Sequence, residues 1–189
     1  MVRYALVGYG KVAHVHAKAI REAKESSLVA VWGRNKEKAE AFAAEWNITP
    51  FTDMQQMVKQ EKVDAVIITT PHPLHKEHAI TALQAGAHVL VEKPMALTVS
   101  ECDAMIEVAK QEKKQLGVIS QRRWFPASQR IRKAIDDGKL GTPMIGQVTM
   151  LGWRDEDYYN SDPWRGKWDS EGGGVLINQA PHQLDLLYW

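Results

Sequence analysis

Short apolar runs alternate with longer segments of helical periodicity along most of the chain. Apolar and β-branched runs predict strands at residues 4–7, 28–32, 65–69, 88–91 and 116–120. Between them, apolar residues three or four positions apart predict helices at residues 11–24, 36–46, 75–85 and 99–113. Nearly continuous apolar strands joined through helices indicate a parallel sheet covered on both faces. We therefore predict a doubly wound α/β domain over residues 1–120.

The pattern changes after residue 120. It predicts a helix at residues 127–136 ended by Gly138, a strand at 144–151, a long loop, and a helix from about residue 180 to the end. Five of the seven tryptophans lie in this part, at positions 124, 153, 164, 168 and 189. A module of about 70 residues with so little regular structure buries little core by itself. We expect residues 121–189 to pack on the first domain, on another chain, or on polypeptide that is absent.

The composition narrows the functional classes. The 189 residues include 24 Lys and Arg against 23 Asp and Glu, which gives a formal charge of +1. The protein therefore lacks the strong positive electrostatic field of most nucleic-acid-binding proteins. Cys102 is the sole cysteine, which excludes internal disulfides and cysteine-based metal centres and fits a reducing compartment. No apolar stretch approaches the roughly 20 residues of a membrane-spanning helix. We expect a soluble, cytoplasmic protein without nucleic-acid or membrane partners.

A glycine-rich turn joins the first predicted strand to the first predicted helix. It reads Gly8-Tyr9-Gly10-Lys11-Val12-Ala13, a G-x-G-x-x-A pattern in the strand-turn-helix context that gives the pattern meaning. Gly8 permits the tight turn, Gly10 lets a pyrophosphate approach the backbone, and Ala13 allows close packing of helix and strand. Amides at the helix N-terminus then face the phosphates. The turn predicts a dinucleotide site; a glycine turn without ligand is the alternative.

The choice of dinucleotide is expected at the end of the second strand. An acidic residue there usually holds the ribose hydroxyls of NAD. This chain has no carboxylate in that turn, which reads Gly33-Arg34-Asn35-Lys36. Since Arg34 can pair with a 2′-phosphate, the sequence favours NADP over NAD. If Arg34 is only solvated, both cofactors bind.

Glu92-Lys93-Pro94 directly follows the strand at residues 88–91, at the edge where open α/β sheets bind ligands. The Lys93 ammonium can donate to a hydroxyl or carbonyl oxygen, and desolvation can bring its pKa toward the working range of a proton carrier. Glu92 could position Lys93 or be a surface charge. Without other motifs, the tripeptide is an ordinary loop.

A second candidate segment runs from Gly172 to Asp185. If a helix begins at Ala180 or Pro181, Asn178 can cap it, and His182 lies within its first turn. A histidine there can exchange protons near neutral pH, and the glycines before it permit close approach to a substrate. A packing histidine is the alternative.

Several motifs in order resemble one family. They are Gly8-x-Gly10-x-x-Ala13, Thr70-Pro71 followed by His75, residues 85–94 through Glu92-Lys93-Pro94, Gly138-x-x-Gly141, and the segment 172–185. Together they resemble the Gfo/Idh/MocA family, named for glucose-fructose oxidoreductase and inositol dehydrogenase. The resemblance implies a Rossmann domain over residues 1–120, followed at residues 121–189 by the beginning of an α/β domain with an open sheet, a partial substrate-binding or oligomerisation domain. It also implies a nicotinamide-dependent oxidoreductase acting on sugars, cyclic polyols or their derivatives.

The resemblance also implies residue roles. Lys93 and His182 align with the family's catalytic lysine and histidine, and Thr70, Pro71 and His75 with its loop over the dinucleotide. Many members carry Asp where this chain has Asn178, so a carboxylate that could raise the basicity of His182 is missing. The chain also stops at Trp189, earlier than the resemblance leads us to expect. It could be a fragment of a longer protein, or a shortened natural form whose exposed strand edge is covered by a second subunit. We expect a homo-oligomer.

Further side chains extend the predicted substrate site. Arg123, after the last Rossmann strand, could line the cleft. Trp153 and Arg165 belong to an aromatic and arginine-rich loop that suits either sugar stacking or a subunit interface. A histidine at every third position from 72 to 78 does not keep one helical face, and we predict no metal. His14 and His16, two positions apart in one helix, are assigned to packing and solvent separately.

The sequence thus predicts hydride transfer between NAD(P) and a secondary alcohol of a sugar, cyclic polyol or derivative. Substrate oxygen would lie between Lys93 and His182. One alternative is a dinucleotide-sensing or interaction protein with impaired catalysis on the same fold. Another is a glycosidase that oxidises its substrate transiently.

Overall fold

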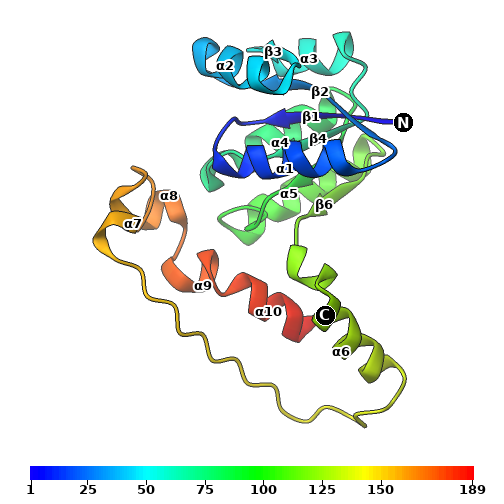
Figure 1. The fold of residues 1–189 in the computed structure, drawn as a ribbon, viewed down its shortest axis with the longest axis vertical. Coiled ribbons are helices and arrows are strands. Elements are labelled where there is room, and N and C mark those ends of the chain that lie inside the picture. The colour runs from blue at the N-terminus through cyan, green and yellow to red at the C-terminus, as the bar shows by residue number, and fades with distance from the viewer. The chain divides into compact units, whose positions relative to one another are not determined.

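The computed structural model describes residues 1–189 and divides them into two compact units, 1–118 and 119–189. The first unit contains one six-stranded sheet in the order β3-β2-β1-β4-β5-β6 (Figure 1). Every neighbouring pair is parallel. The strands are β1 (Val2–Val7), β2 (Ser26–Trp32), β3 (Thr49–Phe51), β4 (Ala65–Ile68), β5 (His88–Val91) and β6 (Leu116–Val118). This is the predicted doubly wound Rossmann sheet.

Helices connect these strands and cover the sheet. They are α1 (Lys11–Glu22), α2 (Lys36–Trp46), α3 (Met54–Gln60), α4 (His75–Gln84) and α5 (Val99–Gln111), with a short 3₁₀ helix η1 (His72–Leu74) before α4. The chain moves outward in one direction through β1, β2 and β3 and in the other through β4, β5 and β6. Because parallel crossovers are right-handed, α1 and α2 lie on one face of the sheet and α4 and α5 on the other.

Apolar strands buried on both sides form the core of this unit. Val7, Ile68 and Val91 are fully buried at paired positions of the three central strands β1, β4 and β5. Several helices begin at side-chain caps: Asn35 accepts from the amide of Lys38, Asp53 from Gln56 and Thr98 from Glu101. The elements predicted for residues 1–120 are all present, and β3 and α3 are two that the pattern did not predict.

The second unit is helical. A 3₁₀ helix η2 (Gln121–Trp124) precedes α6 (Pro126–Asp136), α7 (Glu156–Asn160), α8 (Trp168–Glu171), α9 (Gly174–Asn178) and α10 (Pro181–Tyr188). The predicted helices at 127–136 and from about 180 correspond to α6 and α10, and Gly138 follows α6 with φ of +71°. None of the chain's helices is both long and apolar enough to cross a membrane.

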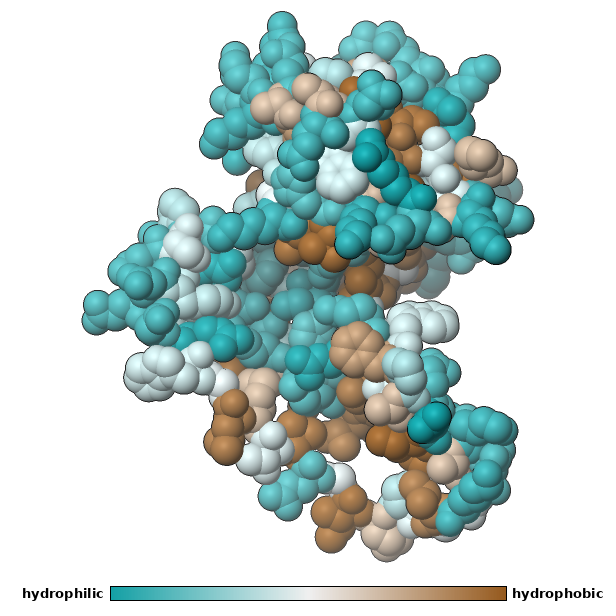
Figure 2. All heavy atoms as spheres, in the orientation of Figure 1, coloured by the Kyte–Doolittle hydropathy of each residue, from teal (hydrophilic) through white to brown (hydrophobic).

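The predicted strand at residues 144–151 is wrong for this structure. The segment has no regular secondary structure, and Met144, Ile145 and Leu151 are 86%, 91% and 94% exposed. A strand needs a hydrogen-bonding partner, and residues 119–189 supply no second strand. Apolar side chains accordingly gather on the surface over α6 and the chain that follows it (Figure 2).

Candidate functional site

The turn after β1 has the geometry that its glycines predict. Gly8 has φ of +105°, and a Cβ there would lie 2.9 Å from Thr69 Oγ1. Its amide donates to the carbonyl oxygen of Trp32 at 3.0 Å, which ties the turn to the end of β2. Only glycine therefore fits position 8 without strain.

The next glycine faces open space. Gly10 is the N-cap residue of α1, no side chain caps that helix end, and a Cβ at Gly10 would meet no atom within 4 Å. Ala13 is fully buried, and its amide donates to the Gly10 carbonyl at 2.9 Å. Uncapped amides beside an open glycine suit a pyrophosphate. These residues therefore fit a dinucleotide.

The neighbouring residues of the turn lie toward β2. A Cβ on Gly33 would come within 2.1 Å of Tyr9 Cε1, so the tyrosine ring covers Gly33. Lys11 and Val12, in the first turn of α1, are exposed. The predicted cofactor residues from positions 8–13 and 33–34 thus lie at the carboxyl ends of β1 and β2.

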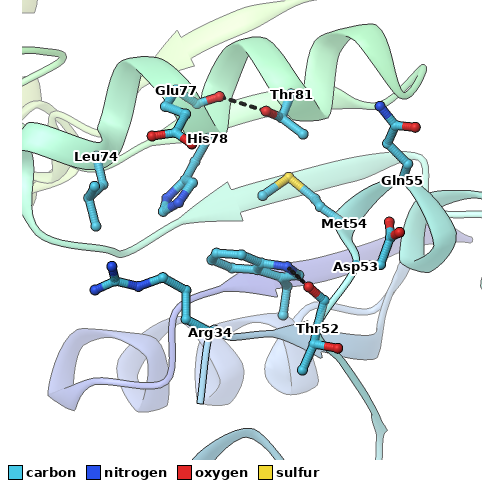
Figure 3. A pocket seen from close by; sticks show the side chains of 10 residues that line it. Arg34, Thr52, Asp53, Met54, Gln55, Leu74, Glu77, His78 and Thr81 are labelled. Atoms are coloured by element: carbon cyan, nitrogen blue, oxygen red, sulfur yellow. Dashed lines mark hydrogen bonds between the residues drawn. The ribbon is translucent and has the colours of Figure 1, made fainter. Parts of the chain in front are cut away.

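A pocket of about 430 Å³ opens beside the end of β2. Arg34 lies at one end of it with Leu74 and His78, while Thr52 and Asp53 line the other end (Figure 3). The Trp32 indole packs edge-on against the His78 ring, with centroids 4.7 Å apart, and donates to the Thr52 carbonyl at 2.9 Å. Sequence reasoning found Arg34 but missed the walls formed by residues 52–55 and 74–81, which come from later segments.

The charges in this pocket are mixed. Arg34 is its one permanent cation, whereas Asp53 and Glu77 contribute carboxylates. Burial lowers the pKa of His78 to about 4, so the ring is neutral near pH 7. A 2′-phosphate in this pocket would therefore depend on Arg34 for its charge partner.

His75 joins two loops at the same edge of the sheet. Its ring is fully buried, with Nδ1 2.8 Å from the Pro94 carbonyl oxygen and Nε2 2.8 Å from the Thr70 carbonyl oxygen. Burial lowers its pKa. Beside it, Thr70 Oγ1 lies 3.0 Å from His78 Nδ1. His75 thus ties the loop after β4, which contains Thr70 and Pro71, to the loop after β5.

The loop after β5 carries Lys93, and the Lys93–Pro94 peptide is cis. Glu92 Oε1 lies 2.8 Å from His16 Nε2, and Glu92 Oε2 accepts from the Lys93 amide at 3.2 Å. Burial raises the pKa of Glu92, but the His16 hydrogen bond and charge and the Lys93 amide outweigh it and leave this pKa below its ordinary value. Lys93 therefore sits beside a carboxylate that is ionised and held.

The prediction that His14 and His16 serve packing and solvent separately is wrong for His16. His14 packs against Phe42 and accepts from Trp46 Nε1 at 3.1 Å. His16 instead pairs with Glu92, and both side chains are less than a fifth exposed. The two residues are 76 positions apart, so no local spacing could have indicated the contact.

The other candidate residues lie in the second unit. His182 is the second residue of α10. Arg123 donates from Nε and Nη2 to the two oxygens of Asp185 at 2.8 and 2.6 Å, and these hydrogen bonds lower the pKa of Asp185. Arg123, predicted to line the cleft, thus forms a bidentate ion pair at the helix that carries His182.

Asn178 does not cap the last helix, as the sequence had suggested. Ala180 precedes α10 without any side-chain cap, and Asn178 ends α9. Its Nδ2 donates to Glu171 Oε1, and Glu171 Oε2 accepts from the Gly166 amide at 2.7 Å. Both side chains are buried, at 8% and 2% exposure. Sequence reasoning missed Glu171.

The aromatic loop divides into internal and exposed parts. Arg165 Nη1 donates to the Tyr158 hydroxyl at 2.9 Å, and the Arg165 guanidinium lies 4.6 Å from the ring centroids of both Tyr158 and Trp164. Asn178 and Gln179 direct their Nδ2 and Nε2 to the same hydroxyl. Trp153 is 87% exposed. Arg165 therefore organises this loop from within.

Comparison with known proteins places the chain in a family. The family described as oxidoreductases with an NAD-binding Rossmann fold, Gfo/Idh/MocA, matches residues 2–120, and the Gfo/Idh/MocA C-terminal domain matches residues 128–189. The WlbA dehydrogenase of Bordetella pertussis, solved with NADH and UDP-GlcNAcA, is 35% identical with a TM-score of 0.93. The alignment covers all of this chain and 54% of that one.

Two curated relatives carry more specific names. The D-glucoside 3-dehydrogenase of Escherichia coli is 31% identical over 97% of this chain and 52% of its own. The NADP-dependent scyllo-inositol 2-dehydrogenase of Bacillus subtilis is 33% identical over 75% of this chain and 43% of its own. The chain thus spans about half the length of the curated relatives it matches. On the match to both of its regions, this chain belongs to the Gfo/Idh/MocA oxidoreductase family.

Proposed function

We propose that the protein transfers a hydride between NAD(P) and a secondary alcohol of a sugar, cyclic polyol or derivative. The observation that carries this proposal is the shared edge of one parallel sheet, where the Gly8–Ala13 turn and the Lys93 loop follow β1 and β5. Relatives named for a D-glucoside, an inositol and 1,5-anhydro-D-fructose support the substrate class. A homo-oligomer working in the cytoplasm remains part of the proposal.

The first unit would bind the dinucleotide. Gly10 leaves room for the pyrophosphate, and the uncapped amides of α1 donate to it. The nicotinamide supplies the hydride acceptor in oxidation and the hydride donor in reduction. The task left to this chain is to orient the substrate and to manage the hydroxyl proton.

Lys93 and His182 would handle that proton. In oxidation, the substrate O–H gives its proton to one of these side chains as the C–H bond breaks; in reduction, the same group returns it. Positioned proton transfer of this kind contributes about 10² to 10⁴-fold in rate. The proposal requires the amine and the imidazole to meet at one substrate oxygen.

The cofactor preference is proposed to be NADP, through Arg34. The Bacillus relative is NADP-dependent, whereas the Bordetella structure contains NADH. Dissociation constants for NADH and NADPH decide the point. Tighter binding of NADH than of NADPH would refute the preference.

Turnover is tested with a panel of scyllo-inositol, D-glucosides, 1,5-anhydro-D-fructose and UDP-GlcNAcA, followed by nicotinamide absorbance. The Lys93→Met variant should lose turnover while binding dinucleotide as the parent does. Equal turnover in that variant would defeat the assignment. Dinucleotide binding with no turnover across the panel would favour the dinucleotide-sensing protein. Release of a leaving group without a net change in NADH would favour the glycosidase.

A further inference from the structure

The Lys93 loop is held by side chains on two sides. On one side, Glu92 uses both carboxylate oxygens, Oε1 toward His16 Nε2 at 2.8 Å and Oε2 toward the Lys93 amide at 3.2 Å. On the other, the Pro94 carbonyl oxygen lies 2.8 Å from His75 Nδ1. The backbone of Lys93 is therefore fixed immediately before and after the residue.

His16 comes from the helix that begins at the open glycine. α1 starts directly after Gly10, and His16 lies in its second turn. The ring of His16 is 16% exposed and the carboxylate of Glu92 17%. The same helix thus presents its N-terminal amides to the dinucleotide site and its His16 ring to the lysine loop.

We infer that His16 is a positioning residue for Lys93 that acts through the Glu92 carboxylate. Because His16 holds Oε1, Oε2 stays directed at the Lys93 amide. This fixes the position of the Lys93 backbone, from which the lysine side chain extends. Misplacing a catalytic group by about 1 Å costs about 10²-fold in rate. The inference rests on the proposed function, in which Lys93 transfers the proton.

The side chains suggest a matched set of variants. His16→Leu removes the hydrogen bond to Glu92, and His16→Gln offers an amide N–H in its place. Glu92→Gln keeps the shape of the side chain but replaces the carboxylate with an amide, whose oxygen is a weaker hydrogen-bond acceptor. His14→Leu is the control, because His14 lies on the same helix and contacts Phe42 and Trp46 instead.

A measurement that needs no substrate reports on Lys93 directly. Competitive acetylation with acetic anhydride, read by mass spectrometry, gives the labelling rate of Lys93 relative to the exposed Lys18. We expect the loss of the His16 hydrogen bond in His16→Leu to change this ratio by about threefold or more, and His16→Gln to bring it back toward the parent value. An unchanged ratio in His16→Leu would overturn the inference.

Kinetics on the substrate found in the panel separate positioning from folding. We expect His16→Leu to lower kcat by about ten- to a hundredfold while KM and the NADPH dissociation constant stay near the parent values. A fall in dinucleotide affinity equal to the fall in kcat would mean that His16 only supports the helix. Should Lys93→Met retain turnover, the proposed function fails, whereas the labelling result still decides whether His16 holds the loop.

Discussion

The two glycines of the turn after β1 should fail in different ways when each is replaced by alanine. At Gly10 the φ and ψ of −77° and −178° are open to alanine, and a Cβ would meet no atom within 4 Å. As an N-cap residue, alanine destabilises the folded state by about 0.5–1 kcal/mol relative to glycine. It also lowers the conformational entropy of the unfolded chain, which stabilises the folded state by about 0.4–1 kcal/mol. Gly10→Ala should therefore leave the free energy of unfolding nearly unchanged.

The same methyl group should obstruct the dinucleotide. It would stand where the pyrophosphate approaches the helix amides, and overpacking of this kind costs about 1–3 kcal/mol. A loss of about 1.4 kcal/mol or more is tenfold or more in the dissociation constant. Titration of the purified variant with NADH and NADPH, beside urea unfolding of the apoprotein, measures both quantities. Parental affinity in Gly10→Ala would show that the pyrophosphate does not bind at this turn.

Gly8→Ala provides the contrast. Its Cβ would lie 2.9 Å from Thr69 Oγ1 and 3.2 Å from the Thr69 carbonyl carbon, at a φ of +105°. Backbone strain of about 1–3 kcal/mol adds to an overpacking cost of similar size. Gly8→Ala should therefore lower the unfolding free energy by about 3 kcal/mol. If Gly8→Ala has the same free energy of unfolding as Gly10→Ala, the backbone strain inferred at position 8 is wrong.

Three other changes test the cofactor pocket, its histidine and the second unit. Arg34→Gln should weaken NADPH binding by about tenfold, as expected for the loss of a charge-assisted hydrogen bond, and should leave NADH binding near the parent value. Lys36→Gln is the control. Equal losses of affinity for both cofactors would exclude a 2′-phosphate contact. The unfolded chain protonates His78 below about pH 6.5 and the folded one only near pH 4, so stability should fall by up to about 3 kcal/mol as pH drops through that window. Urea unfolding of His78→Gln should show a flatter pH dependence, and an unchanged slope would assign the loss to other groups. Glu171→Ala should destabilise the second unit by about 2 kcal/mol or more, because Asn178 loses a buried acceptor; tryptophan fluorescence during unfolding measures this, and a parental midpoint would contradict it.

The sequence predicted those parts of the fold that local pattern determines. β4 is a four-residue apolar run, and β5 consists of three apolar residues after His88; both lie between helical segments. α2 begins at the cap residue Asn35. β3 was missed because its three residues, Thr49–Phe51, include a proline and form no alternating or apolar run. The segment at 144–151 has strand periodicity, but periodicity supplies no partner strand.

The same distinction applies to the candidate site. The glycine turn and the Lys93 loop were predictable because the residues that define each are adjacent in sequence. The pair of His16 and Glu92 was not, since its partners are 76 positions apart and meet only when α1 packs beside the end of β5. Arg123 was identified, but its bidentate partner Asp185 lies 62 positions later. Contacts between distant segments depend on the fold as a whole, which a motif does not encode.

Asn178 shows how this affects the interpretation of a motif. Compared position by position, the chain lacks the carboxylate that many family members carry four residues before the histidine. In the structure a carboxylate lies one hydrogen bond away, because the Asn178 amide donates to buried Glu171, seven residues earlier. That bond fixes which way the amide points, with Nδ2 toward Glu171 and Oδ1 away from it. A carboxyl group can thus act on a motif position without occupying it, so the asparagine alone does not indicate that the histidine segment lacks a carboxyl group.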